Sequence, residues 1–220
     1  LPATNGYVTR AECFFVSHFW QSKNNPDPSG KYLRLHQQEL RSQHWSYIWI
    51  DWTYVPQHPR TQNEEIFFQR TLQTLSGLIR NCGFAWCYPP FEARLWILYE
   101  VAEFTLSYTD ALCHSPDIKK FADHINEMVQ VGVRPTLIRN GYRCSYDRDK
   151  EYLTSWLEVL VLLRQLLVDI QDVRDLLDKL TWFPGAGVIL THTTNGVKIL
   201  RFEGRLIVSG EEYAFTPFPK

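Results

Sequence analysis

The sequence predicts an α/β fold built on a parallel sheet, followed by helices and a small antiparallel β-meander. Three short apolar runs, at 13–17, 47–51 and 83–88, have the composition of strands that are buried on both faces. Helical patterns separate these runs. Strands that alternate with helices in this way form a parallel sheet with right-handed crossovers.

The segments between the apolar runs repeat apolar residues at helical intervals, at 32–40 and at 64–79. After Pro89-Pro90, which breaks the chain, we expect a third helix over 91–107. Its apolar stripe consists of Ala93, Ile97, Val101 and Phe104. These elements account for the first half of the chain.

The second half is predicted to be helical and then β-rich. Helices are expected at 118–131, 150–170 and 173–182, with a polar loop at 139–149. Four short alternating runs follow, separated by turn residues such as Asn195-Gly196, and they predict an antiparallel meander. The runs lie at 188–192, 197–202, 205–209 and 213–216. We therefore expect an α/β domain over 1–149 and a helical and β-meander extension over 150–220, packed on it.

The charge and the hydropathy of the chain indicate which kinds of binding partner to expect. The formal net charge is -1 and no Lys/Arg run offers cations to phosphates, so nucleic acid is not an expected partner. The longest apolar stretch, 156–170, is interrupted by charged residues, so no membrane span is expected. The five cysteines form an odd set without a CxxC pair, which favours reduced thiols. With neither an initiator Met nor a basic-then-apolar leader, we expect a cytoplasmic domain rather than a secreted precursor.

The residues that suggest chemistry follow the predicted strands. Trp96 and Glu100 stand four apart in the helix after the third strand, so they share one helix face. His18 and Trp20 follow the first strand, and Asp51 ends the second. In open parallel sheets, ligands bind at the carboxyl ends of the strands. An acidic group beside an indole there is suited to holding an aromatic ring and a developing cation.

Other chemistries lack their patterns. Cys113-His114 and the pair His44 and His58 do not have the spacing of a tetrahedral zinc site, so no metal is expected. No glycine-rich phosphate loop of the GxxxxGKS or GxGxxG form occurs in the chain, and no cofactor is expected.

Three short motifs, Phe14-Phe-Val-Ser-His18, Ile48-Trp-Ile-Asp51 and Trp96-xxx-Glu100, together resemble the Toll/interleukin-1 receptor (TIR) domain. The tract 48–57, with Glu64-Glu65 and 82–86 downstream, is also similar to the fungal heterokaryon-incompatibility (HET) domain, which is itself TIR-like. The resemblance covers about residues 10 to 110 and implies a flavodoxin-like parallel sheet flanked by helices. Two features depart from it: no further strands are evident between 107 and 149, and Phe19 stands where many TIR enzymes carry a basic residue.

TIR enzymes cleave NAD between nicotinamide and ribose, and the resemblance implies Glu100 as the catalytic carboxylate. Nicotinamide leaves as a neutral molecule from a cationic pyridinium, so no general acid is needed and one carboxylate suffices. We expect an NAD glycohydrolase or ADP-ribosyl cyclase of immune or cell-death signalling, with NAD as substrate. The expected substrate-binding residues are His18, Trp20, Asp51 and Trp96.

Each assignment has a structural alternative. Glu100 is equally consistent with a solvated or salt-bridged helix residue, and Trp96 with a core residue or pocket wall. His18 fits a hydrogen-bonded structural histidine, and Asp51 fits a cap of the following turn. For the whole chain, the alternative is a non-catalytic module that associates with further copies or with adaptors through its TIR-like face.

Overall fold

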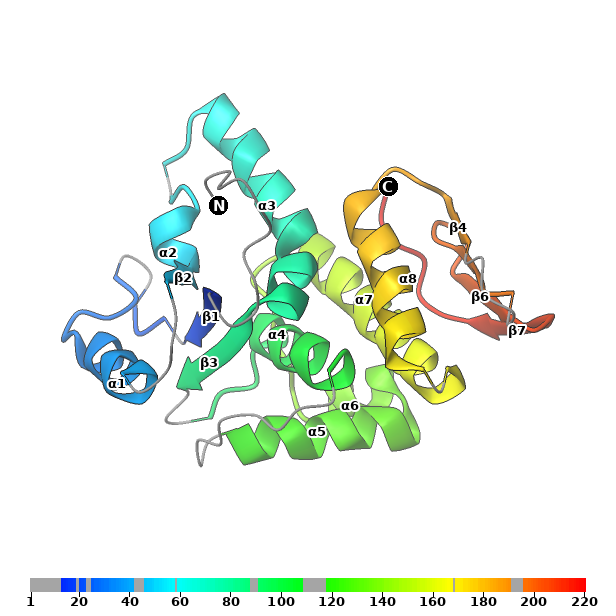
Figure 1. Cartoon of the computed structure of the whole chain (residues 1–220), viewed down its shortest axis with the longest axis horizontal. Helices are drawn as coiled ribbons and strands as arrows, with labels where there is room; N and C mark the ends of the chain where they lie inside the picture. The colour runs from blue at the N-terminus through cyan, green and yellow to red at the C-terminus, as the bar shows by residue number, and fades with distance from the viewer. Residues whose placement is uncertain are drawn as a thin grey trace. The chain divides into compact units, whose positions relative to one another are not determined.

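The computed structural model describes residues 13–18, 20–22, 25–41, 46–57, 59–87, 91–108, 118–167, 169–190 and 196–220, with only the backbone at His18, Glu39 and 85–87. The chain divides into two compact units (Figure 1). Unit 1 comprises residues 1–91 and 112–118, and unit 2 comprises residues 92–111 and 119–220. The expected boundary between residues 149 and 150 falls inside unit 2, within helix α7 (Asp147–Leu166).

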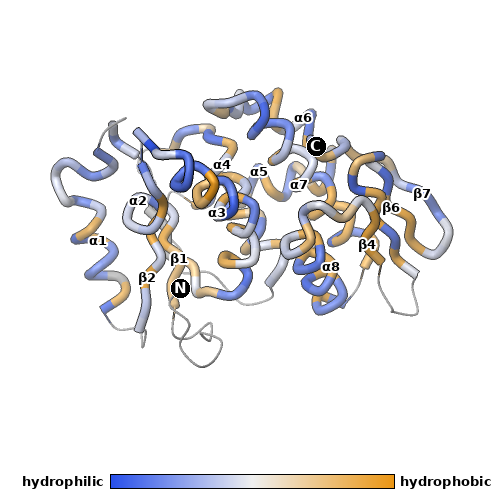
Figure 2. The backbone as a smooth tube through the Cα atoms, turned by 90° about the horizontal axis from the view of Figure 1, so that it is seen from above, coloured by the Kyte–Doolittle hydropathy of each residue, from blue (hydrophilic) through white to orange (hydrophobic). Residues whose placement is uncertain are grey.

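Unit 1 contains a three-stranded parallel sheet in the order β2-β1-β3. Its strands are β1 (Cys13–His18), β2 (Tyr47–Ile50) and β3 (Gly83–Cys87). The three predicted strands and their parallel direction are therefore confirmed. Figure 2 shows hydrophobic residues along most of β1, as expected for the central strand of a buried sheet.

Aromatic rings cross one face of this sheet. Phe15 lies opposite Trp49 on one side and Phe84 on the other, and the ring centroids are 4.6 and 5.5 Å apart. On the other face, Leu40 and Val16 form a buried cluster with Phe14 and the two isoleucines of β2. Gly83 is required beside Phe14, because a Cβ atom at that position would approach the phenyl ring to 2.7 Å.

The helices of unit 1 are α1 (Lys31–Leu40), α2 (Asp51–Tyr54) and α3 (Gln62–Asn81). Helices α1 and α3 confirm the predicted helices at 32–40 and 64–79. Helix α2 differs from the prediction, because the strand ends at Ile50 and Asp51 is already the first helical residue. Helix α3 begins at a capping box in which Thr61 and Glu64 satisfy each other's backbone N–H groups.

Unit 2 is mainly helical. Its helices are α4 (Leu95–Leu106), α5 (Ile118–Val131), whose first residue belongs to unit 1, α6 (Val133–Arg139), α7 and α8 (Ile170–Trp182). Four of them confirm the predicted helices, and α6 is additional. Between residues 118 and 149, the described chain forms helices and one isolated bridge, from Arg143 to Arg94, and contributes no strand to the parallel sheet.

The meander is confirmed as a four-stranded antiparallel sheet in sequential order. Its strands are β4 (Val188–Leu190), β5 (Lys198–Leu200), β6 (Arg205–Val208) and β7 (Glu211–Ala214). Gly204 turns the chain between β5 and β6 with φ of +66°, and Phe215 donates its backbone N–H to the Gly204 carbonyl over 2.8 Å. In the described part of the chain, no helix has the length and apolar character needed to cross a bilayer.

Candidate functional site

The predicted site residues belong to two units. His18, Trp20 and Asp51 lie in unit 1, whereas Trp96 and Glu100 lie in unit 2. Within each unit, one hydrogen bond between an indole and a carboxylate involves these residues. The side chain of His18 lies outside the described residues, so its backbone position at the end of β1 is what the structure gives.

In unit 1, the structure brings Trp20 and Asp51 into direct contact. The Trp20 indole donates from Nε1 to Asp51 Oδ2 over 2.9 Å, and both side chains are partly buried. The other carboxylate oxygen, Oδ1, accepts the backbone N–H of Trp52 at 2.7 Å. Because β1 and β2 are neighbours and parallel, the residues that follow them meet at one edge of the sheet. Asp51 thus joins the loop after β1 to the first turn of α2.

The loop after β1 is held by its own hydrogen bonds. Gln21 donates its backbone N–H to the Pro26 carbonyl at 3.1 Å, and Asp27 N–H donates to Asn25 Oδ1 at 3.1 Å. Asp27 Oδ2 then accepts the backbone N–H of Leu33 at 2.9 Å, in the first turn of α1. These hydrogen bonds tie Gln21 to Pro26 and Asp27 to the first turn of α1.

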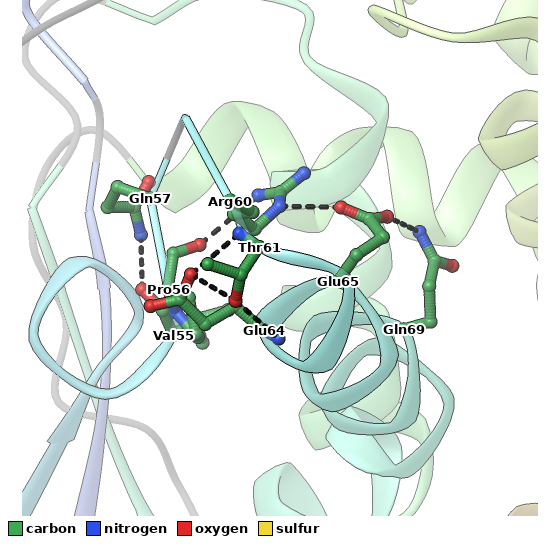
Figure 3. A network of polar contacts seen from close by, with 8 residues as sticks. All are labelled: Val55, Pro56, Gln57, Arg60, Thr61, Glu64, Glu65 and Gln69. Atoms are coloured by element: carbon green, nitrogen blue, oxygen red, sulfur yellow. Dashed lines mark hydrogen bonds and ion pairs between the residues drawn. The ribbon is translucent and has the colours of Figure 1, made fainter.

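The segment between α2 and α3 is fixed by a buried arginine (Figure 3). Arg60, whose side chain is 9% exposed, donates from Nε to Glu65 Oε2 at 2.7 Å and from Nη1 to the Pro56 carbonyl at 3.2 Å. Its guanidinium lies 3.6 Å from the centroid of Phe68. Pro56, Arg60 and Glu65 thus form a network that anchors this segment to α3.

In unit 2, Trp96 contacts a residue that the sequence did not indicate. Its indole N–H donates to Asp149 Oδ2 at 3.4 Å, across the packed helices α4 and α7. Burial raises the pKa of Asp149 above its ordinary value, and the Trp96 hydrogen bond opposes that rise. The indole also packs edge-on against Tyr99, with ring centroids 5.8 Å apart. Trp96 is therefore held on two sides.

Glu100 is partly buried on α4, one turn beyond Trp96. The next acidic residue of the helix, Glu103, is 0% exposed and accepts the indole N–H of Trp156 at 2.6 Å. Residues 96 and 149 and residues 103 and 156 are each separated by 53 positions, so α4 and α7 run parallel and in register. This pairing has a counterpart in the sequence. Trp96 and Glu103 of α4 are seven residues apart, and so are Asp149 and Trp156 of α7.

Two further features concern ligands. A shallow groove of about 610 Å³ follows α1 and is lined by Arg34, Gln37, Gln38 and Arg41, none of which is a predicted site residue. Among the residues that the structure describes, no group of three His, Cys, Asp or Glu side chains is arranged to hold a metal ion.

Compared with known proteins, the chain has no significant match to a family model, to a curated protein or to a solved structure. The resemblance to TIR and HET domains stays a prediction.

Proposed function

We propose that this protein is a TIR-like enzyme that cleaves NAD at the nicotinamide–ribose bond, as a glycohydrolase or a cyclase in immune or cell-death signalling in the cytoplasm. The observation that carries the proposal is the placement of Glu100. Its carboxylate is partly buried one helical turn from Trp96, an indole that Asp149 and Tyr99 hold in place. Trp20 and Asp51 are the proposed substrate contacts of unit 1, with His18 as the third.

The topology of unit 1 supports the TIR-like assignment. The order β2-β1-β3 is the first part of the flavodoxin-like order 2-1-3-4-5. A flavodoxin-like sheet binds ligands where strand order reverses, outside the carboxyl ends of the strands. In this order the reversal lies between β1 and β3. Trp20 follows β1, and Asp51, which follows β2, accepts its indole N–H.

The proposed chemistry requires one carboxylate. The N-glycosidic bond breaks with its electron pair moving to the pyridinium nitrogen, which releases neutral nicotinamide and leaves an oxocarbenium-like ribose. Glu100 stabilises that positive charge. Water then adds to the ribose carbon and gives up one proton to the solvent, or a nucleophile of the same molecule adds instead. A partly buried carboxylate is better suited to this than an exposed one, because lower local dielectric strengthens its interaction with a developing cation.

The test is NAD turnover by the purified protein, followed as nicotinamide release. The Glu100→Gln variant should lower kcat by about a hundredfold or more while the chain stays folded. Glu92→Gln is the matched control, because Glu92 is an exposed carboxylate of the same unit. If wild-type protein releases no nicotinamide, or if Glu100→Gln turns NAD over like wild type, the proposal is wrong.

A second candidate function, self-association without catalysis, is favoured by a different observation. Ile66 and Phe67 are large apolar side chains on α3 that are 46% and 52% exposed. Exposed apolar side chains mark interaction surfaces where they gather into a patch, and these two are consecutive on one helix. Sedimentation velocity over a range of protein concentrations should then show assembly that the Ile66→Ser/Phe67→Ser variant abolishes. A wild-type chain that stays monomeric and inactive would exclude both functions.

A further inference from the structure

Trp20 has the features of a fixed stacking surface. It follows β1 at the carboxyl edge of the sheet, its side chain is partly exposed, and its N–H edge is tied to Asp51 at 2.9 Å. Among the described side chains, no other aromatic ring stacks on this indole. The hydrogen bond from the indole nitrogen lies in the plane of the ring, so the bond itself covers neither π-face.

The structure also holds both partners of this hydrogen bond in place before any ligand arrives. Asp51 is held by the Trp52 backbone N–H at 2.7 Å, and the loop that follows Trp20 is closed by the bond from Gln21 to Pro26. Arg60 anchors the far end of the segment after α2 to Glu65. Ordering an aromatic side chain in advance lowers the entropic cost of binding a ligand to it.

The indole N–H of Trp20 is bound by the carboxylate of Asp51. This negative charge determines which ligand charge the face of the indole attracts. The negative potential over an indole face attracts cations, and an anion bound at the N–H edge adds to that potential. We propose that Trp20 is a stacking platform for a cationic heteroaromatic ring and that Asp51 is the positioning residue that orients the indole. The inference rests on the proposed function, since the nicotinamide of oxidised NAD is a pyridinium cation.

We expect Trp20 to bind a positively charged ring more tightly than a neutral ring of nearly the same shape. The probes are 1-methylnicotinamide, a permanent cation, and nicotinamide, its neutral counterpart. With 5-fluorotryptophan incorporated into the full chain, ¹⁹F NMR reports each indole, and the Trp20 signal is the one that is missing in Trp20→Phe. Its shift should titrate with the cation at an affinity about two- to fivefold tighter than with nicotinamide.

Variants of Trp20 and Asp51 distinguish stacking on the Trp20 indole from nonspecific binding of the probes to the protein surface. Trp20→Leu lacks the Trp20 signal, so its binding is followed through the ¹H signals of 1-methylnicotinamide, whose broadening by the protein should be lost. Asp51→Asn should narrow the difference in affinity between the two probes, because the carboxylate charge is removed while the indole remains. Trp52, an exposed indole whose backbone but not ring contacts Asp51, is the control signal and should not titrate. Equal affinities of wild type for both probes, or equal shifts at Trp20 and Trp52, would overturn the inference.

Binding and turnover are measured separately, so the two ideas fail in different ways. Cation-selective shifts at Trp20 in a protein that releases no nicotinamide would sustain the platform and refute the enzyme. Nicotinamide release with an unchanged KM for NAD in Trp20→Phe and Trp20→Leu would sustain the enzyme and refute the platform. Circular dichroism of each variant confirms that it is folded before either result is used.

Discussion

The Trp156 indole donates its N–H to the Glu103 carboxylate over 2.6 Å, and neither side chain is exposed to solvent. Trp156 also contacts Tyr99 and Tyr152, with ring centroids 6.3 and 6.0 Å away. A buried carboxylate is costly unless it is hydrogen-bonded, and the indole N–H is a donor with no competing acceptor function. This bond therefore fixes the register of α4 against α7 within unit 2.

Removing the acceptor should destabilise unit 2. In Glu103→Ala, the buried Trp156 N–H loses its partner and the deleted side chain leaves a cavity. We expect the free energy of unfolding to fall by about 3 kcal/mol. Urea denaturation followed by tryptophan fluorescence measures it. Glu92→Ala, at an exposed position, should change stability by less than about 1 kcal/mol. Equal effects of the two variants would contradict the assignment of Glu103 as a buried structural acceptor.

The buried pair of His124 and Tyr142 should make stability depend on pH. The His124 Nδ1 and the Tyr142 hydroxyl lie 2.8 Å apart, and burial lowers the pKa of His124 below 6.5. Between that lowered pKa and 6.5, the unfolded chain binds more protons than the folded chain, so stability is complete above pH 6.5 and decreases as pH falls. One such group contributes a slope of at most about 1.4 kcal/mol per pH unit.

The measurement compares urea unfolding of wild type and His124→Gln between pH 8 and pH 5. Wild type should lose more stability over this interval than the variant, because only wild type carries this titrating group. Parallel curves for the two proteins would show that His124 does not have a lowered pKa in the folded chain.

A comparison of two glycines can distinguish the cost of backbone strain from the cost of a steric clash. Gly204 and Gly141 both have positive φ, +66° and +64°. At Gly204 a Cβ atom would lie 2.3 Å from the Phe215 carbonyl oxygen, whereas at Gly141 nothing lies within 4 Å. Gly141→Ala should therefore cost about 1 to 2 kcal/mol through conformation alone. Gly204→Ala should cost clearly more, because the backbone at Phe215 must move. Thermal unfolding of both variants tests this difference, and equal losses would contradict it.

The Arg60 network should control the order of the segment after α2. Arg60→Met keeps an apolar stem beside Phe68 but removes the bonds to Glu65 and to the Pro56 carbonyl. We expect a loss of about 2 kcal/mol and faster amide exchange over 52–61. Arg70→Met, at an exposed position of α3, is the matched control and should leave exchange unchanged. If both variants exchange like wild type, Arg60 does not anchor this segment.

Local patterns predicted most of the elements. The sequence shows the apolar runs of β1, β2 and β3 and the helical repeats of α1, α3, α4 and α5. The reason is that burial and backbone periodicity determine which residue types occur at neighbouring positions. The meander was predicted from its alternation and turn residues for the same reason. Helix α2 was missed, since a four-residue helix has no period to detect.

The candidate site was predicted in part. The parallel sheet already implied that the residues after β1 and β2 share an edge, and the structure places Trp20 against Asp51 there. The partners of Trp96 and Trp156 were not predicted. Asp149 and Glu103 each lie 53 residues from their indole, and nothing local says which helix will pack against α4.

The sequence by itself determined the strands and all the helices except α2 and α6, that the first three strands run parallel, and that Trp96 and Glu100 share one helix face. Only the tertiary structure decided that Asp149 holds Trp96, that Glu103 is the fully buried carboxylate of α4, and that Asp51 binds Trp20 as well as its own turn. The physical reason is that periodicity and propensity act over a few residues, whereas these hydrogen bonds depend on the register of packed helices and on the meeting of separate loops.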